Sequence, residues 1–345
     1  MTRKILAGLS ITGLERIYQQ LDPSLGVVLT FHRVQPGAND IRIPNAHLSI
    51  EPDFLAGVIQ LLRRRGFEIV SLDELKRGIE NPIAERRMAA LTFDDGFKDN
   101  LQHALPILEA EAAPATVFSA PGLIEGTAAL WWEGLGALVM QQDYFTFTGE
   151  KGPVAFDCTT PSRKEECFQS LVEYLVFRVP EEQMQTRVAE LCWLYKIDVD
   201  EITREAIMTW DELRQMAASP YITIGAHTMN HVHLARLPEE TAREEIQQSA
   251  LVLEAELGRR PRHLAYPYGY PHAAAKREFD LAKDLRFDVA VTTRPGMLFE
   301  DHRDHMTALP RISVNGLYQK NRYFAPLTSG LPSLLANGFS RLNVA

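Results

Sequence analysis

Residues 88–96, Met-Ala-Ala-Leu-Thr-Phe-Asp-Asp-Gly, join an unbroken apolar run to two adjacent carboxylates. The run from Met88 to Phe93 predicts a strand that is buried on both faces, because such strands carry apolar side chains without alternation. Asp94 and Asp95 therefore come where the strand ends, at the edge where barrels and open parallel sheets build active sites. Taken alone, Asp-Asp-Gly is as typical of an ordinary turn as of a functional site.

Strand-like and helix-like segments alternate on both sides of this stretch. Apolar, β-branched runs alternate with amphipathic segments of helical period, which predicts an α/β protein built from parallel βα units. The predicted strands are residues 27–31, 67–70, 88–93, 115–118, 222–226, 263–266 and 289–292, and the predicted helices are residues 52–65, 100–112, 210–217, 238–257 and 273–285.

The alternation breaks between residues 126 and 206. Trp131 and Trp132 open a predicted helix, residues 144–157 alternate like a hairpin, and two further amphipathic segments follow. We interpret this part as an inserted subdomain. The two tryptophans would either shape a substrate cleft or form a small hydrophobic core for the insertion, and the sequence favours neither.

Composition and charge restrict the class of protein. With 345 residues, 46% of them hydrophobic, and a formal net charge of −9, the chain has the composition of an ordinary globular protein. Its short basic runs are scattered, so nucleic acid is not an expected partner. Three cysteines without motif spacing favour a reducing compartment.

The amino-terminal residues bear on localisation. Residues 3–14 superficially resemble an export signal, but charged residues follow at once and a small-x-small cleavage site is missing. No apolar stretch approaches the roughly 20 residues that a membrane-spanning helix requires. We therefore expect a cytoplasmic protein without a transmembrane segment.

Two histidines follow the predicted strand at residues 222–226. His227 and His231 are four residues apart, which on a helical turn places both rings on one face. Two imidazoles and a carboxylate form the three-ligand set of an open metal site, with a further position left for water. The sequence thus predicts a metal site formed by this pair and one carboxylate at another strand end.

Other polar segments carry less weight. His233 is two residues beyond His231 and would face elsewhere. His302 and His305 lie in a polar, Asp-rich segment, where solvated side chains are expected. Residues 265–269 follow a strand and force a tight turn, which can direct backbone N–H groups into a cleft as an oxyanion requires.

Taken together, these motifs resemble those of the polysaccharide deacetylase family, the NodB-homology or carbohydrate esterase family 4 enzymes. Residues 92–96 match the family's Thr-Phe-Asp-Asp-Gly motif, residues 227–231 its His-[Ser/Thr]-x-x-His motif, and residues 266–269 its proline–glycine motif. The resemblance implies an α/β fold, a distorted (β/α) barrel of the NodB-homology type with an inserted α+β subdomain. The implied organisation is an N-terminal helical segment at 1–25, a deacetylase barrel at 26–125 and 207–315, an inserted subdomain at 126–206 and an irregular tail at 316–345.

The resemblance also implies roles for individual residues. Asp94 would be the catalytic base, and Asp95, His227 and His231 would hold a divalent metal ion. The backbone N–H of Tyr268 would help to hold the oxyanion. The metal implied is zinc, and the same ligands also suit cobalt or nickel.

The chain departs from the commonest family pattern at the general acid. No Leu-x-x-His motif occurs near the C-terminal end of the barrel. Residues 30–34 instead resemble the first strand of a branch that includes deacetylases of poly-β-1,6-N-acetylglucosamine. That resemblance makes His32 the candidate acid, and a structural histidine is the alternative. Arg311 resembles a C-terminal arginine of this branch and would orient Asp94, although an ordinary ion pair explains an arginine equally well.

The expected activity is metal-dependent hydrolytic removal of N-acetyl groups from an amino-sugar-containing glycan or its precursor. Hydrolysis of another amide on the same scaffold is one alternative. A catalytically silent glycan-binding barrel is another, which the presence of both Asp94 and Asp95 disfavours.

Overall fold

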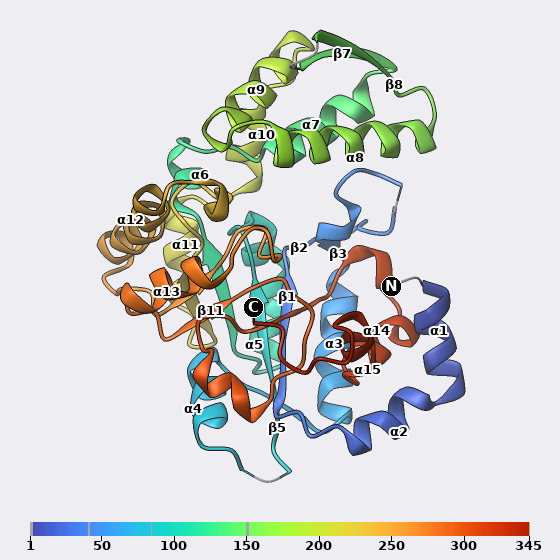
Figure 1. Ribbon diagram of the computed structural model, residues 1–345, viewed down its shortest axis with the longest axis vertical. Coiled ribbons are helices and arrows are strands. Elements are labelled where there is room, and N and C mark those ends of the chain that lie inside the picture. The colour runs from blue at the N-terminus through green and yellow to red at the C-terminus, as the bar shows by residue number, and fades with distance from the viewer. Residues whose placement is uncertain (1–2, 41, 84, 150–151, 345) are drawn as a thin grey trace.

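The computed structural model describes residues 3–40, 42–83, 85–149 and 152–344. Its centre is a sheet of parallel strands (Figure 1). The strands are β1 (Gly26–Phe31), β4 (Phe67–Ile69), β5 (Arg87–Phe93), β6 (Ala115–Ser119), β9 (Ile222–Ala226), β10 (His263–Ala265), β11 (Val289–Val291) and β12 (Ile312–Ser313). Their order is β11-β10-β9-β6-β5-β1-β12, and β4 pairs with the first half of β5. The alternation of strand and helix along the sequence thus predicted the fold class.

The segment before and within β12 connects the two edges of this sheet. Leu309 forms a parallel bridge with Val291 of β11. Three residues later, Ile312 pairs with Leu29 of β1. One short stretch of chain therefore hydrogen-bonds to both edges and closes the sheet into a distorted α/β barrel, the fold class that we expected.

Both faces of the central strands are buried, which explains their continuous apolar sequence. In β1, Val27 and Leu29 belong to the core beneath the surrounding helices, whereas Val28 belongs to a second cluster inside the barrel. Helix α4 (Leu72–Glu80) completes the inner cluster with Leu75 and Ile79. The sequence pattern had not indicated α4, which begins at a capping box formed by Ser71 and Glu74.

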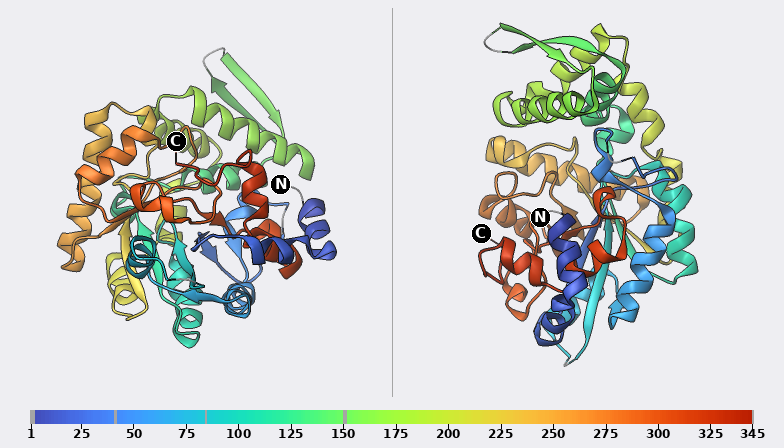
Figure 2. Two further views of the ribbon diagram at one scale, coloured as in Figure 1. Left: turned by 60° about the horizontal axis from the view of Figure 1, so that its bottom comes forward. Right: turned by 90° about the vertical axis from the view of Figure 1, so that its right-hand side faces the viewer.

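Helices surround the barrel (Figures 1 and 2). Those expected from the sequence are α3 (Pro52–Arg64), α11 (Trp210–Ala217), α12 (Glu239–Leu257) and α13 (Lys276–Asp284), with the predicted helix at 100–112 divided into a π-helical turn (Asn100–Ala104) and α5 (Leu105–Ala110).

The two ends of the chain pack together beside α3. The N-terminal segment forms α1 (Arg3–Thr12) and α2 (Leu14–Leu21), and the C-terminal segment forms α14 (Asn321–Leu327) and α15 (Leu331–Ala336). Helix α14 contacts α1, α2 and α3. The expectation of an irregular tail was wrong for these residues, because Phe324 joins the main core and fixes α14 there.

The segment between the two halves of the barrel forms a layer above one end of it (Figure 1; right-hand view of Figure 2). Helix α6 (Pro121–Glu125) leads into this layer, which contains α7 (Trp131–Gln141), β7 (Tyr144–Gly149), β8 (Gly152–Asp157), α8 (Pro161–Arg178), α9 (Glu181–Leu194) and α10 (Val199–Ala206). These elements share a separate hydrophobic cluster, in which residues such as Leu138, Leu171 and Val188 are buried. Among the described residues, no helix is long and apolar enough to cross a membrane.

Candidate functional site

The polar residues singled out in the sequence meet where the parallel strands end. Phe31 of β1 pairs with Phe93 of β5, so the residues that follow them, His32 and Asp94, leave the sheet side by side. The Asp94 N–H donates to the carbonyl oxygen of Phe31 at 2.9 Å. His227 follows β9 directly. The sheet edge thus gathers groups that are distant in the sequence.

Asp95, His227 and His231 form a buried cluster with the geometry of a metal site. Each residue offers a ligand atom, and these atoms lie within 4.8 Å of one another. Oδ1 of Asp95 is 3.3 Å from Nε2 of His227 and 3.3 Å from Nε2 of His231. Two ligands bound at about 2.1 Å in tetrahedral directions are about 3.4 Å apart. The observed spacing therefore suits one small cation between the three atoms.

The hydrogen bonding of His227 supports this interpretation. Its Nδ1 lies 2.8 Å from the carbonyl oxygen of Ala265, so Nδ1 carries the proton and Nε2 of the neutral ring carries a lone pair. That lone pair faces a carboxylate oxygen of Asp95, which requires a cation or a proton between them. Burial lowers the pKa of His227, but contact with Asp95 and the nearby charge of Asp94 raise it overall. Imidazole oriented by a backbone carbonyl is a common feature of metal ligands.

The same cluster shows unusual backbone geometry. Asp95, Thr228, His231 and Tyr268 have φ angles of 74°, 58°, 53° and 63°. These values lie in the left-handed region, which is uncommon for residues other than glycine and costs free energy. The surrounding structure keeps two of the three candidate ligands in this conformation.

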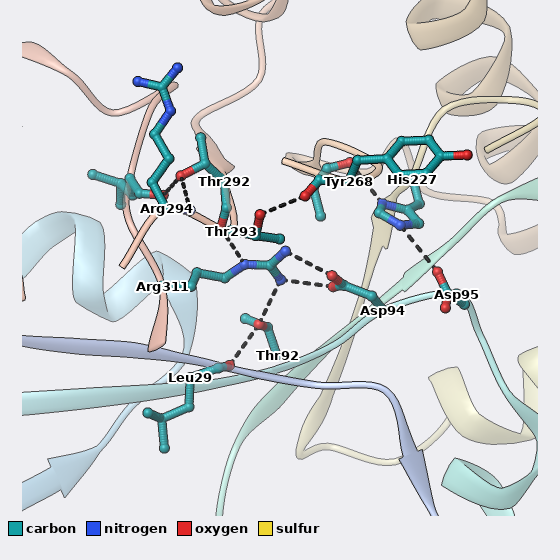
Figure 3. Close-up of polar contacts among 12 residues, drawn as sticks. Leu29, Thr92, Asp94, Asp95, His227, Tyr268, Thr292, Thr293, Arg294 and Arg311 are labelled. Atoms are coloured by element: carbon teal, nitrogen blue, oxygen red, sulfur yellow. Dashed lines mark hydrogen bonds and ion pairs between the residues drawn. The ribbon is translucent and has the colours of Figure 1, made fainter. Parts of the chain in front are cut away.

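Asp94 does not join the cluster but pairs with Arg311 (Figure 3). Nη1 of Arg311 donates to Oδ1 of Asp94 at 2.8 Å, and Nη2 donates to Oδ2 at 2.7 Å. Arg311 also donates to the carbonyl oxygen of Thr292 and to the hydroxyl of Thr92, which itself donates to Leu29. Burial alone would raise the pKa of Asp94, but the charge of Arg311 lowers it. Asp94 is therefore held as an oriented carboxylate.

Tyr268 lies in a tight turn after β10, as the sequence indicated. Its carbonyl oxygen accepts a hydrogen bond from the Thr293 hydroxyl at 2.5 Å. A side chain at Gly269 would approach the Thr293 nitrogen to 2.5 Å, which explains why glycine follows. Within the described part of the chain, the N–H of Tyr268 donates to no acceptor. This free donor is available to a ligand.

His32 lines the same cavity as Asp94 and Asp95. Burial lowers the pKa of His32, and the negative charges of Asp95 and Asp94 oppose this effect. The imidazole therefore lies beside two carboxylates that favour its protonated form, within an environment that favours its neutral form.

The cavity in front of the cluster has a volume of about 500 Å³, and the insertion forms one side of it. Trp131 and Trp132 line it and also belong to the hydrophobic core of the insertion, so the core interpretation is confirmed, and a role in a substrate cleft stays a prediction. The Trp132 ring lies 4.7 Å from the ring of His231, and Nε1 of Trp131 donates to the Tyr268 hydroxyl at 3.3 Å. The periodicity of the sequence did not predict that α7 would line this cavity.

The remaining histidines lie outside the candidate ligand set. His233 is buried beside Tyr268, with ring centroids 5.4 Å apart, and is not a member of the cluster. The expectation of a solvated His302 was wrong, because its side chain is fully buried in a 3-10 turn, where its Nδ1 contacts the backbone of Phe299. His305 is half-buried in the same segment.

Comparisons with known proteins agree with this fold and site. The sequence profile of the family described as polysaccharide deacetylase matches residues 82–142 and 197–289, which carry the Asp-Asp and His-x-x-x-His motifs. A search of curated protein sequences gave no match.

Several solved structures share the fold at low sequence identity. The Streptococcus pyogenes deacetylase PplD in complex with acetate is 18% identical, with a TM-score of 0.57 over 89% of this chain and 99% of that chain. IcaB from Ammonifex degensii is 18% identical, with a TM-score of 0.55 over 89% and 98%. The deacetylase domain of BpsB from Bordetella bronchiseptica is 18% identical, with a TM-score of 0.51 over 85% and 98%. In the two segments that the family profile matches, in its fold and in its buried Asp95, His227 and His231, the chain is therefore similar to the polysaccharide deacetylase family.

Proposed function

We propose that this protein is a metal-dependent N-deacetylase that removes acetyl groups from an N-acetylated amino sugar in a glycan or glycan precursor. The observation that carries the proposal is the arrangement of two carboxylates with separate partners. Asp95 faces two imidazoles at 3.3 Å, whereas Asp94 is paired with Arg311 and stays free of the cluster. One carboxylate is thus placed for a metal ion and its neighbour for proton transfer.

The donor set suits a divalent cation. Two imidazole nitrogens and one carboxylate oxygen are the ligands of open catalytic zinc sites, and they also accept cobalt or nickel. We propose zinc. Bound there, the cation would supply Lewis acidity, which polarises an amide carbonyl and lowers the pKa of a neighbouring water.

Asp94 is placed to accept the proton of the attacking water. Arg311 engages each Asp94 oxygen once, which leaves further lone pairs directed to the cavity. Because Arg311 keeps the pKa of Asp94 low, the group is ionised before the reaction begins. Its orientation is set by a fully buried partner rather than by solvent.

The N–H of Tyr268 and the imidazole of His32 would complete the reaction. The free N–H is suited to hold the negative oxygen that forms when water adds to the amide carbon. The C–N bond then breaks, and the departing nitrogen needs a proton, which we assign to His32. Water and an N-acetyl amine give acetate, a free amine and one proton, which is released to solvent. Asp94 has gained one proton and His32 has lost one, so transfer of a proton from Asp94 to His32 returns both groups to their starting states.

The amino-sugar substrate rests on the family and on aromatic groups in the cavity. Trp131, Trp132, Tyr268 and Tyr270 line it, and aromatic rings can pack against the apolar faces of a sugar. The related PplD structure holds acetate, the acid that the proposed reaction releases.

The proposal is tested by measuring metal content and acetate release on the same purified samples. Chitooligosaccharides, β-1,6-linked N-acetylglucosamine oligomers and lipid-linked N-acetyl sugars are the substrates. We expect one metal ion per chain and acetate release that stops on chelation and returns with zinc. A metal-loaded protein that binds these sugars without releasing acetate would instead be a glycan-binding barrel, and release of another acid from a different amide would redirect the substrate assignment.

A further inference from the structure

Helix α8 of the insertion places an apolar surface opposite the reacting groups. Phe168, Val172 and Val176 are four residues apart, so they form a line along one face of the helix. All three line the cavity that Asp95 lines, as does the next residue, Phe177. Leu171 and Leu175 on the other apolar face of α8 are fully buried in the core of the insertion, to which Phe168 and Val176 also belong, so Val172 and Phe177 are the residues of this surface that remain accessible.

Hydrogen bonds hold α8 in this position relative to the metal cluster. Arg236 donates to the carbonyl oxygens of Val176 and Val179, at the C-terminal end of α8. Glu181 accepts a hydrogen bond from the His233 N–H at 2.9 Å. These contacts join α8 and the start of α9 to the segment that directly follows His231. The apolar surface is therefore a fixed part of the site.

A ring contact marks one end of the surface. Phe177 lies 6.5 Å from Tyr270, which belongs to the loop after β10, measured between ring centroids. Phe177 is 52% exposed although it is large and apolar. An apolar group that runs along Val172 and Val176 would cover this ring and remove it from water.

Along α8, the cavity has few polar side chains that could bind the hydroxyl groups of a purely polar polymer. Gln169 is the polar cavity residue on α8, and Asn45 already donates to the Trp132 carbonyl oxygen. Among the described residues, the lining contains no lysine or arginine, whereas it contains Asp94 and Asp95. Sugar hydroxyls buried here without partners would cost free energy. The surface favours an uncharged apolar group.

We propose that the amino sugar carries an apolar chain that lies along α8 while its amide reaches Asp94. This inference rests on the proposed deacetylase function and narrows the substrate to an amphiphilic glycoconjugate. The chain can be attached through the glycosidic oxygen of an N-acetylated sugar, or it can be the acyl group of the amide itself, in which case the acid released is longer than acetate and the proposed function extends to that amide. Both sources present the same chemistry to Val172 and Phe177, and the experiment separates them.

Binding is measured first, because it does not depend on turnover. Calorimetry with zinc-loaded Asp94→Asn protein compares the methyl and octyl glycosides of N-acetylglucosamine, and the methyl glycosides of N-acetyl- and N-octanoyl-glucosamine. We expect an octyl chain in one of the two pairs to lower Kd by about 10²-fold, as burial of a few methylenes requires. The pair that shows the effect identifies the source of the chain.

Variants test whether α8 is the binding surface. Val172→Asn and Phe177→Ser change partly exposed side chains and are expected to reduce the octyl advantage about tenfold. Ser170→Asn changes an exposed residue of the same helix that does not line the cavity, and it should keep the advantage. Circular dichroism and zinc content establish that each variant is folded.

Two results would overturn the inference: equal Kd values for methyl and octyl compounds in both pairs, or an octyl advantage that survives both α8 variants. Acetate or amine release by the wild-type enzyme is then measured with the same compounds. Turnover without an octyl preference would refute only the apolar surface. An octyl preference in binding, without turnover of any amide, would keep the surface and refute the deacetylase function.

Discussion

Arg311 and Asp94 form a bidentate ion pair although 217 positions separate them in the chain. The arginine side chain is fully buried, and the carboxylate is almost so. A buried charge without its partner is strongly unfavourable, so each residue fixes the other. The pair also gives the two adjacent aspartates different partners, because Asp95 faces His227 and His231 instead.

Removal of the arginine should therefore affect both stability and activity. We expect Arg311→Gln to reduce the free energy of unfolding by about 3–5 kcal/mol, as found when one partner of a buried ion pair is removed. Without the guanidinium the pKa of Asp94 rises, so the acid limb of the kcat/KM profile should move to higher pH. Arg311→Lys keeps the charge and should shift this limb less. An unchanged acid limb in a folded Arg311→Gln protein would contradict the orienting role.

Loss of either candidate histidine ligand should remove the metal. His227→Ala and His231→Ala are expected to lack bound metal and acetate release, because two remaining ligands hold a cation poorly. His272→Ala, which changes an exposed histidine, is the matched control and should keep both. Atomic emission on dialysed protein measures occupancy. Full occupancy in either ligand variant would show that the assignment is incorrect.

Asp94→Asn should separate metal binding from catalysis. The variant keeps Asp95, His227 and His231, so we expect normal metal content in the folded protein, while proton transfer from water is lost and turnover falls by about 10²- to 10⁴-fold. Because Arg311 loses its charged partner, the free energy of unfolding should also fall, as in Arg311→Gln. Metal content and acetate release are measured on one preparation. Turnover close to that of the wild type would exclude Asp94 as the base.

His32→Ala tests the general acid. We expect amide hydrolysis to slow by about 10²- to 10⁴-fold with the metal retained, since a leaving amine needs a proton. An activated aryl acetate has a leaving oxygen of low basicity, so its hydrolysis should slow much less. Equal losses on both substrates, or loss of the metal, would mean that His32 is structural or a ligand.

The local sequence was sufficient to predict seven of the eight strands of the described sheet, but not the two-residue β12. Apolar runs such as residues 27–31 and 88–93 required strands buried on both faces, and the polar residues after them had to meet at one sheet edge. Asp95, His227 and His231 were accordingly expected together and lie together. The partnership of Asp94 with Arg311 was suggested only by the family resemblance, because nothing local to either residue indicates it.

Other features depend on packing that the sequence pattern does not show. Helix α4 is only nine residues long; its capping box and the helical spacing of Leu72, Leu75 and Ile79 are sequence signals that the prediction missed, whereas its contact with the inner cluster depends on packing. Phe324 makes α14 part of the core, although the neighbouring sequence suggested an irregular tail. The position of α8 over the cavity follows from contacts of Arg236, which lies in the barrel, and Glu181, which lies in the insertion.

The segment that joins Leu309 to β11 and Ile312 to β1 also carries Arg311 between these two pairings. When this segment pairs with both strands and closes the barrel, it therefore also places Arg311 beside Asp94. During synthesis, the strands that bear Asp95, His227 and His231 emerge before this segment does. A nascent or truncated chain that stops short of it holds every candidate metal ligand but lacks the group that orients the proposed base, so we expect hydrolytic activity only after the final strand has joined the sheet.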